Sequence, residues 1–414
     1  MHRIRTSLPY FERFGWEPEV VSIDTTQSEM VKDSLLLKSV PNHIKLHTVQ
    51  AFSKKWTSKF KLGSLALRSL YFYDKKVSRI LKSNSFDLIY FSTTQFPVTI
   101  LGNYWKQKFG IPYVIDMQDP WHSDYYLNKP KNEQPAKFWF SYQLNKYLEP
   151  IALKKVDGLI SVSMAYINTL KLRYFGLSKI PTSVITFGAF EEDFVIAKKN
   201  ASHLTPAFIR LEKMTHLVYV GRGGNDMEKA IRLLFEAFKS GLQQDSENFN
   251  KLRIHFIGTS YAPFGKGKHT IYPIAKEYGL QNLVEEQTDR IPYYQGIQTL
   301  LHADALFIPG SDDPQYTASK IYPYILARKP LLVIFNPASS ASDIIQKCNA
   351  GTVVNLLDSK NAIEEIYSFL LDLTNNPRKP KETNWDEFKS YSAENMTKRQ
   401  CELFDKVISN QATV

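Results

Sequence analysis

The stretch from Ala303 to Pro330 contains the residues best suited to bind a phosphate. It predicts an apolar strand, a loop rich in Gly, Ser, Asp and Pro, and a helix that ends near Arg328. The N-terminal end of a helix favours an anion, because it presents backbone amides and a positive dipole. Thr317 and Ser319 are N-cap residue types, and Lys320 adds a cation at the same place. The alternative is an ordinary strand-loop-helix joint in which the hydroxyls only cap their own helix.

A second glycine-rich turn follows an apolar strand and precedes a helical pattern. Its glycines, Gly221, Gly223 and Gly224, nearly spell a dinucleotide-binding fingerprint, but Asp226 stands where the third glycine belongs. The next strand ends in Gly258, where that fingerprint needs the acid that holds a ribose. The turn is therefore typical of a phosphate-binding loop and not of a dinucleotide site.

Acidic, imidazole and aromatic side chains gather in the segment DMQDPWHSDYY, directly after a predicted strand. Asp119 and His122 are its candidates for proton transfer, and its Trp and Tyr side chains suit stacking on a sugar. A carboxylate-rich loop that merely caps the next helix is the competing interpretation.

The elements that must position these residues alternate between strand and helix. Strands are predicted at residues 20–23, 87–91, 112–115, 158–162, 216–220, 252–258, 305–308 and 330–335. Most are followed by a loop and a helical pattern, which indicates an α/β fold with parallel, doubly wound sheets. Ligands of such sheets bind beyond the carboxyl ends of the strands, where both glycine-rich loops are expected to lie.

Size and charge narrow the possible functions. A chain of 414 residues with 43% hydrophobic content indicates two globular domains. A net charge of +11 points to an anionic partner such as a phosphorylated ligand, an acidic membrane or nucleic acid. No apolar run is long enough to span a membrane and no signal-peptide pattern is present. The only cysteines, Cys348 and Cys401, make neither a disulfide framework nor a metal cluster, and favour a cytoplasmic location.

Residues 45–82 combine many lysines and arginines with Trp56, Phe60 and other aromatics, and contain an apolar helical stripe. This composition suits peripheral contact with an anionic membrane or a lipid-phosphate acceptor. A solvated helix face explains the charge equally well. Nucleic acid fits less well, because no recognised reader motif accompanies the charge.

The chain opens with a predicted helix at 3–14, before its first strand. A doubly wound domain usually opens with a central strand and a glycine-rich turn. We therefore expect that a first strand and its loop are missing. The alternative is a domain that starts with its helix.

Five local patterns, in order along the chain, resemble retaining glycosyltransferases of the family-4-like kind. They are DLIYFSTTQFP, GIPYVIDMQDPW, VDGLISVSMAYINTL, VITFGAFEEDF and GRGGNDMEKAIRLLFEAF. The resemblance covers nearly the whole chain and implies the B-type architecture, with two doubly wound Rossmann-like domains facing each other across a cleft. It implies an acceptor-side domain over 1–188, a linker over 189–215, a nucleotide-sugar-binding domain over 216–384, and a C-terminal helix over 385–414 that crosses back.

In that family, the Arg and Lys of a Gly-Arg…Lys element hold the diphosphate of the nucleotide-sugar donor. Two cations at a helix start neutralise a pyrophosphate and stabilise the charge that builds on the leaving group. The stretch TASKIYPYILARKPLL resembles the family's Ser-Lys element, which lies beside the same phosphates. The resemblance therefore implies the following donor-binding residues: Gly221, Arg222, Lys229, Tyr316, Thr317, Ser319 and Lys320.

The implied reaction moves a sugar from a nucleotide sugar to a hydroxyl of a surface polysaccharide or lipid-linked glycan, with retention. The leaving diphosphate itself can take the acceptor proton, and the protein contributes positioning and charge stabilisation. Asp119 is the first candidate to orient or deprotonate the acceptor, and His122 is the second. We expect no metal and no cofactor, because cations neutralise the diphosphate and no metal-ligand spacing is present.

The sequence also departs from the family pattern. Where the family commonly has a pair of glutamates, this chain has Gln315 and Pro323. The second glutamate usually grips the donor ribose, so its loss favours a non-catalytic sugar-nucleotide-binding or scaffold subunit. The retained Gly-Arg…Lys and Ser-Lys elements favour an enzyme. A third hypothesis is an epimerase or hydrolase of the nucleotide sugar that keeps the same fold.

Overall fold

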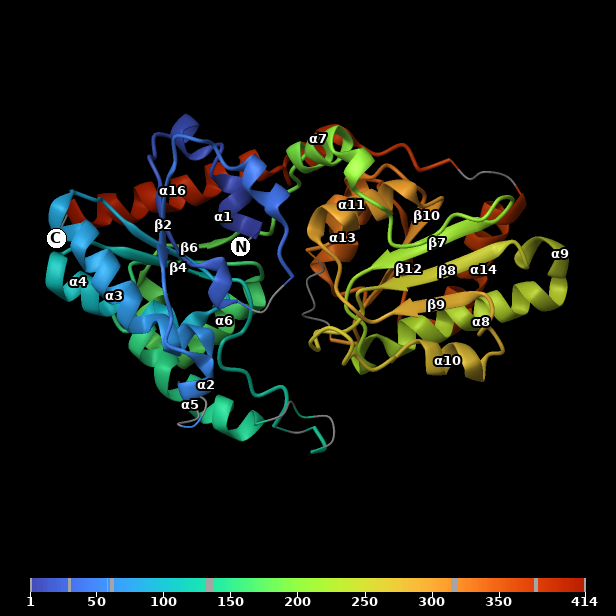
Figure 1. The fold of residues 1–414 in the computed structure, drawn as a ribbon, viewed down its shortest axis with the longest axis horizontal. Coiled ribbons are helices and arrows are strands. Elements are labelled where there is room, and N and C mark those ends of the chain that lie inside the picture. Colours follow the sequence, from blue (N-terminus) through green and yellow to red (C-terminus); the bar gives the residue numbers. More distant parts are fainter. Residues whose placement is uncertain are drawn as a thin grey trace. The chain divides into compact units, whose positions relative to one another are not determined.

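A computed structural model describes residues 2–28, 31–57, 59, 63–127, 129–131, 134, 137–313, 319–375 and 379–412. The chain forms two compact units, drawn in Figure 1. Unit 1 comprises Met1–Glu29, Val40–Gly188 and Ala393–Val414. Unit 2 comprises Met30–Ser39 and Ala189–Ser392.

The bounds of these two units differ from the predicted domain bounds in two places. Residues 189–215 form no separate linker: they contain helix α7 (Glu192–Lys199) and belong to unit 2. The C-terminal return begins with α16 (Ala393–Ala412), not at residue 385, because α15 (Trp385–Lys389) is part of unit 2.

Residues 30–39, between two strands of unit 1, belong to unit 2. The Asp33 carboxylate accepts a hydrogen bond from the backbone N–H of Tyr294, 2.8 Å away, at the start of α11 (Tyr293–His302). The buried Asp193 accepts hydrogen bonds from the Tyr293 and Tyr294 hydroxyls and ties α7 to the same helix. Hydrophobic patterning does not reveal such attachments, because polar side chains make them.

Unit 1 contains a parallel sheet of four strands in the order β3 (Ile89–Ser92), β4 (Tyr113–Met117), β5 (Gly158–Ser161) and β6 (Thr182–Val184). A separate parallel pair joins β1 (Glu19–Ile23) to β2 (Lys45–Val49). The helix predicted at the start is interrupted: α1 (His2–Ser7) and the 3-10 helix η1 (Phe11–Phe14) flank Pro9, which has no backbone N–H to donate.

Alternation along the central strands gives unit 1 two apolar cores, one on each face of the sheet. Tyr113 and Ile115 face the core that includes residues of α3 (Leu65–Ser83), α4 (Ile100–Phe109), α5 (Phe138–Leu153) and α6 (Met164–Arg173). Val114 and Ile160 face the other core, to which α16 contributes Met396, Leu403, Phe404 and Val407. The C-terminal helix thus completes the first unit.

Unit 2 contains a parallel sheet of six strands whose central members are almost completely buried. In order, they are β12 (Thr352–Asn355), β11 (Leu331–Phe335), β10 (Ala305–Pro309), β7 (Thr215–Val220), β8 (Leu252–Ile257) and β9 (Val284–Gln287). The chain runs outward from β7 to β9 and then returns to the other side of β7 as β10. The strand order therefore reverses between β7 and β10, which is where doubly wound sheets bind their ligands.

The longer helices of unit 2 are α8 (Glu228–Gln244), α11, α13 (Ser340–Lys347) and α14 (Ser359–Asn375), with the short α9 (Ser246–Phe249), α10 (Tyr272–Glu277) and α12 (Ile321–Leu326) between them. The helix predicted after the 303–313 segment is shorter than expected. Lys320 is the N-cap of α12, and Arg328, with φ of 54°, has left the helical conformation before Pro330. Residues 314–318 lie outside the described part of the chain.

Candidate functional site

Loops from neighbouring strands meet at the switch point of unit 2. Gly221, directly after β7, donates its N–H to the carbonyl of Ile257 at the end of β8, 2.9 Å away. Asp312, after β10, donates its N–H to the carbonyl of Asp226, also 2.9 Å away. The two glycine-rich stretches that the sequence singled out are therefore hydrogen-bonded to each other at the carboxyl edge of the sheet.

Arg222 and Asp226 form a bidentate ion pair within the first of these loops. The two guanidinium nitrogens lie 2.8 and 2.6 Å from the two carboxylate oxygens. Burial raises the pKa of Asp226, but the hydrogen bonds and charge of Arg222, helped by Ser311, outweigh it and bring the pKa below its ordinary value. Asp226 is therefore ionised at neutral pH and holds the guanidinium at the loop.

Lys320 brings a second cation to the same turn. Its ammonium lies 2.5 Å from the hydroxyl of the fully buried Tyr219 and 4.6 Å from the centre of that ring. Burial, together with the positive charges of Arg222 and Arg290, lowers the pKa of Lys320 to about 7, although Asp226 opposes the shift. A negatively charged ligand bound next to this amine would therefore stabilise its protonated form.

The glycine at position 221 is required by this packing. A Cβ atom there would lie 2.5 Å from the Lys320 ammonium and 2.6 Å from the Tyr219 hydroxyl. Because atoms do not approach so closely, any side chain at this position displaces the lysine. The absence of a side chain at Gly221 thus leaves the space that Lys320 and Tyr219 occupy.

Arg290 is a third cation near Lys320, and no sequence pattern predicted it. Its Cδ atom packs 3.5 Å from the position a Cβ of Gly258 would take, and its guanidinium lies 4.0 Å from the centre of the Tyr261 ring. It follows β9, which carries Glu285 and Glu286 and therefore lacks the apolar run that marks a buried strand. The sequence feature that could have identified Arg290 is its place as a cation just beyond the end of a strand.

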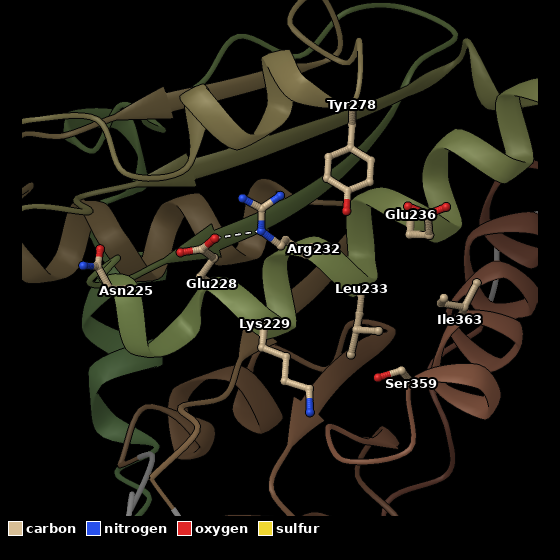
Figure 2. A pocket seen from close by; sticks show the side chains of 9 residues that line it. All are labelled: Asn225, Glu228, Lys229, Arg232, Leu233, Glu236, Tyr278, Ser359 and Ile363. Atoms are coloured by element: carbon tan, nitrogen blue, oxygen red, sulfur yellow. Dashed lines mark hydrogen bonds and ion pairs between the residues drawn. The ribbon is translucent and has the colours of Figure 1, made fainter.

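The remaining predicted donor residues are placed differently. Ser319 is exposed beside Lys320. Tyr316 and Thr317, like Gln315, lie outside the described residues, whereas Pro323 falls inside α12. Lys229 is exposed on α8 and lines an open groove of about 640 Å³, in which its side chain extends away from Arg232 (Figure 2).

The groove in Figure 2 is lined mainly by residues of α8, together with Tyr278 and the first turns of α14. Its charged residues are two cations, Lys229 and Arg232, and two anions, Glu228 and Glu236. Arg232 is already paired with Glu228 at 2.7 Å and with Glu277 at 2.7 Å. This balance of charge suits a diphosphate less well than the cluster of Arg222, Arg290 and Lys320 does.

In unit 1, His122 lies after β4 and is 8% exposed. Neither ring nitrogen has a hydrogen-bond partner among the described residues, and the ring packs 4.7 Å from that of Tyr142. Burial and the charge of Arg173 lower the pKa of His122, and Glu149 and Asp124 oppose the shift only in part. The imidazole is therefore neutral at pH 7 and able to accept a proton.

Asp119, the other predicted catalytic residue, is exposed three residues before His122. Although part of its surface is exposed, the surrounding protein and the charge of Asp116 raise the pKa of Asp119. Asp116 itself is fully buried and forms an ion pair with Arg3, whose Nε lies 2.6 Å from Oδ2. Asp116 is thus part of the interior of unit 1, whereas Asp119 is accessible from the surface.

Several proteins of known structure have a similar fold over nearly the whole chain. The chain is 15% identical to sucrose-phosphate synthase from Thermosynechococcus elongatus, with a TM-score of 0.60 over 98% of this chain and 93% of that one. It is likewise 15% identical to HepE from Anabaena, solved in complex with UDP, with a TM-score of 0.56 over 97% of this chain and 94% of that one.

The N-terminal domain of trehalose-6-phosphate phosphatase from Candida albicans is also similar, with 12% identity and a TM-score of 0.57 over 97% of this chain and 93% of that domain. No protein-family model and no curated protein sequence matches the chain. The fold is the glycosyltransferase B-type architecture of two Rossmann-like units, which the sequence resemblance implied.

The described residues contain no group of three or more His, Cys, Asp or Glu side chains arranged to hold a metal ion. Within the same ranges, every helix is too short or too polar to cross a membrane.

Proposed function

We propose that the protein is a glycosyltransferase that binds a nucleotide-sugar donor at the switch point of unit 2. The observation that carries this proposal is a group of cations at this switch point: Arg222 and Lys320 lie at the Gly221 turn, and the positive charges of Arg222 and Arg290 both act on Lys320. Supporting it, similar folds include a sucrose-phosphate synthase and a HepE solved with UDP and glucose.

The diphosphate of the donor takes its place against these cations. Lys320 gains an anionic partner for its ammonium, and Arg222 can exchange one of its two bonds to Asp226 for a phosphate oxygen. In the transition state, charge builds on the leaving diphosphate, and cations already in place stabilise it without reorganisation. Ser319, Lys229, Tyr316 and Thr317 stay in the proposal as further donor contacts from the same loops and the adjoining helix.

Acceptor activation is proposed for the segment after β4. The exposed Asp119 orients the acceptor hydroxyl, and the neutral His122 accepts its proton where the diphosphate does not. We propose retention of configuration and a surface polysaccharide or lipid-linked glycan as the acceptor. The protein supplies position and charge, and no metal or cofactor takes part in the proposed steps.

Contact with an anionic membrane is part of this proposal, at the cytoplasmic face. The exposed residues Lys54, Lys55 and Trp56 lie on α2 (Lys54–Thr57), just before the amphipathic α3. Lysines beside an exposed tryptophan are typical of surfaces that rest on anionic lipid headgroups. Sedimentation with phosphatidylglycerol vesicles tests it: we expect binding that weakens with salt, and equal binding to phosphatidylcholine vesicles contradicts the electrostatic part.

The main alternative is a sugar-nucleotide-binding subunit without catalysis. The specific observation in its favour is Pro323 inside α12, where the family pattern has the glutamate that grips the donor ribose. Such a subunit binds the donor through the same cations but leaves it intact.

The fate of a labelled donor distinguishes these functions. The protein is incubated with sugar-labelled UDP-, GDP-, TDP-, ADP- and CMP-sugars, with and without a lipid extract that contains the acceptor. Label that moves into the lipid or polymer fraction supports the transferase. Free labelled sugar without acceptor indicates a hydrolase, an altered sugar nucleotide indicates an epimerase, and a bound but unchanged donor supports the binding subunit.

A further inference from the structure

The backbone of His122 is held at both of its polar groups by one ion pair, in which Glu149 is buried and Arg173 is half-buried. Its N–H donates to Oε2 of Glu149, 2.9 Å away, and its carbonyl accepts from a guanidinium nitrogen of Arg173, 3.0 Å away. The same nitrogen of Arg173 lies 2.6 Å from Oε1 of Glu149. The loop that carries the imidazole is therefore fixed from α5, which contains Glu149, and from α6, which contains Arg173.

Glu149 is completely buried, and its partners satisfy both of its oxygens. In addition to His122 and Arg173, the hydroxyl of Tyr174 donates to Oε1 over 2.9 Å. An ionised carboxylate in such a place is costly unless it is paired and hydrogen-bonded. By contrast, the imidazole that it supports is nine-tenths buried, and neither ring nitrogen has a hydrogen-bond partner within the described ranges.

We propose that Glu149 is a positioning residue for the reaction proposed above: it fixes His122 so that the imidazole can accept the proton of the acceptor hydroxyl. This rests on the proposed function, but its structural half can be tested without any activity. The role is indirect, because Glu149 touches the backbone of His122 and not the reacting atoms.

The charged and titratable groups that act on the imidazole come from three elements. Glu149 and Lys146 lie on α5, Arg173 lies on α6, and Asp124 lies on the loop of His122 itself, 3.8 Å from Nε2. The ring of Tyr142, also on α5, packs against it. Burial and Arg173 lower the pKa of His122, and Glu149 is the first of the groups that raise it. Neutralising Glu149 therefore lowers this pKa further, while neutralising Arg173 raises it.

The test is an NMR titration of the histidine side chains in the full-length protein, with the His122 signal assigned through its loss in His122→Gln. We expect Glu149→Gln to lower the His122 pKa by about one unit, the usual effect of removing a neighbouring opposite charge. The matched control is Asp157→Asn in the same unit. Asp157 also accepts a backbone N–H, from Tyr113, and also pairs with a cation, Lys106, but it does not act on His122.

A His122 pKa that stays the same in Glu149→Gln, while both variants lose similar stability, overturns the proposal and leaves Glu149 a purely structural residue. If Glu149→Gln does not fold, Arg173→Gln tests the same cluster from the other side. The pKa of His122 must then rise, and a constant value overturns the proposal.

In a transfer assay, the acidic limb of kcat/KM against pH must move with the His122 pKa in Glu149→Gln, because a proton acceptor works only when it is unprotonated. A limb that stays in place while the pKa moves overturns the catalytic half of the proposal. Absence of transfer with every donor in the wild type contradicts the proposed function instead, and the NMR result is unaffected by it.

Discussion

At the scale of single residues, the amine of Lys320 titrates near neutral pH. Its pKa of about 7 means that the free protein holds a mixture of ammonium and neutral amine near neutrality. A bound diphosphate favours the charged form, so binding above pH 7 requires proton uptake. We therefore expect donor affinity to fall as the pH rises from 6.5 to 8.5, approaching about tenfold per pH unit above pH 7.

Calorimetric titration of the donor across this pH range measures the effect, and Lys320→Gln is expected to bind weakly with a flat pH dependence. A wild type whose affinity does not change with pH contradicts the assignment of Lys320 to the diphosphate.

Lys320 is also expected to lower the stability of the fold, although the proposed donor binding requires it. A lysine whose folded pKa lies below its ordinary value of about 10.4 binds fewer protons in the folded than in the unfolded chain, so at neutral pH it destabilises the fold. Lys320→Met removes this cost and keeps the aliphatic stem. We expect a higher melting temperature without ligand and a loss of donor binding; a lower melting temperature contradicts the argument.

Part of this site was predicted from the sequence. Lys320 was predicted from its residue type at a helix start and Arg222 from the family resemblance, and the structure places both at the switch point with the glycine turn. Arg290 and Tyr219 were not predicted. A buried tyrosine on a strand looks like an ordinary core residue, and its contact with Lys320 joins positions 101 residues apart. Glu149 was missed for the same reason, since its partners lie on other elements.

At the scale of elements, two glycines of unit 2 allow a direct test of local packing. Gly296 lies inside α11, and a Cβ there meets its nearest neighbour at an ordinary 3.7 Å. Gly310 follows β10, and a Cβ there would lie 2.4 Å from the backbone oxygen of Ile334. We expect Gly296→Ala to stabilise the protein by about 0.5–1 kcal/mol, because alanine favours helix and limits the unfolded chain.

Gly310→Ala is expected to destabilise the protein by about 1–3 kcal/mol, because backbone atoms on the neighbouring strand must move. Urea denaturation of the two variants measures both changes. If both substitutions change the free energy of unfolding by the same amount, the prediction is wrong, because the backbone near Gly310 can then move to accommodate a Cβ atom.

Element boundaries show where sequence patterns stop being informative. The buried parallel strands β7, β8, β10 and β11 were predicted close to their observed bounds, because continuous apolar runs mark them. In contrast, β9, with the sequence VEEQ, was missed. Its Glu286 is nevertheless buried and accepts the backbone N–H groups of Thr270, Ile271 and Tyr272. A carboxylate that serves backbone amides in another loop is invisible to periodicity.

At the scale of the whole molecule, the chain passes between its two units more often than its domain pattern indicates. The short stretch 30–39 joins unit 2 through the carboxylate of Asp33 at the start of α11, a hydrogen bond from Lys38 to Asn200, and packing against α7 and α11. Segment lengths and hydrophobic patterns identified the two sheets. They could not predict which sheet this stretch joins, because its attachment depends on a polar contact between residues 261 positions apart.

Unit 2 also contains a pair of buried histidines that makes its stability depend on pH. His216 and His255 are hydrogen-bonded to each other at 2.9 Å. Burial lowers the pKa of both, that of His255 to about 4, although Glu285 opposes the shift there. The unfolded chain, with ordinary histidine values near 6.5, binds more protons below that pH. The stability of unit 2 should therefore fall as the pH drops from about 6.5 to about 4.

Thermal unfolding across this range tests the expectation. His255→Gln should flatten the pH dependence, whereas His203→Gln, at an exposed histidine of the same unit, should leave it unchanged. A melting temperature of unit 2 that does not change between pH 7 and pH 4 contradicts the prediction.

The central claim is that unit 2 binds a nucleotide sugar through the cation cluster at its switch point. The most direct test is thermal melting of the wild type, Arg222→Ala and Arg232→Ala against UDP-, GDP-, TDP-, ADP- and CMP-sugars. The two arginines are matched, because each pairs with a carboxylate four positions away, but only Arg222 belongs to the cluster.

One nucleotide class, at about 100 times its dissociation constant, should stabilise the wild type and Arg232→Ala by about 2.7 kcal/mol and leave Arg222→Ala unchanged. No stabilisation of the wild type by any donor, or equal stabilisation of all three proteins, would contradict the account.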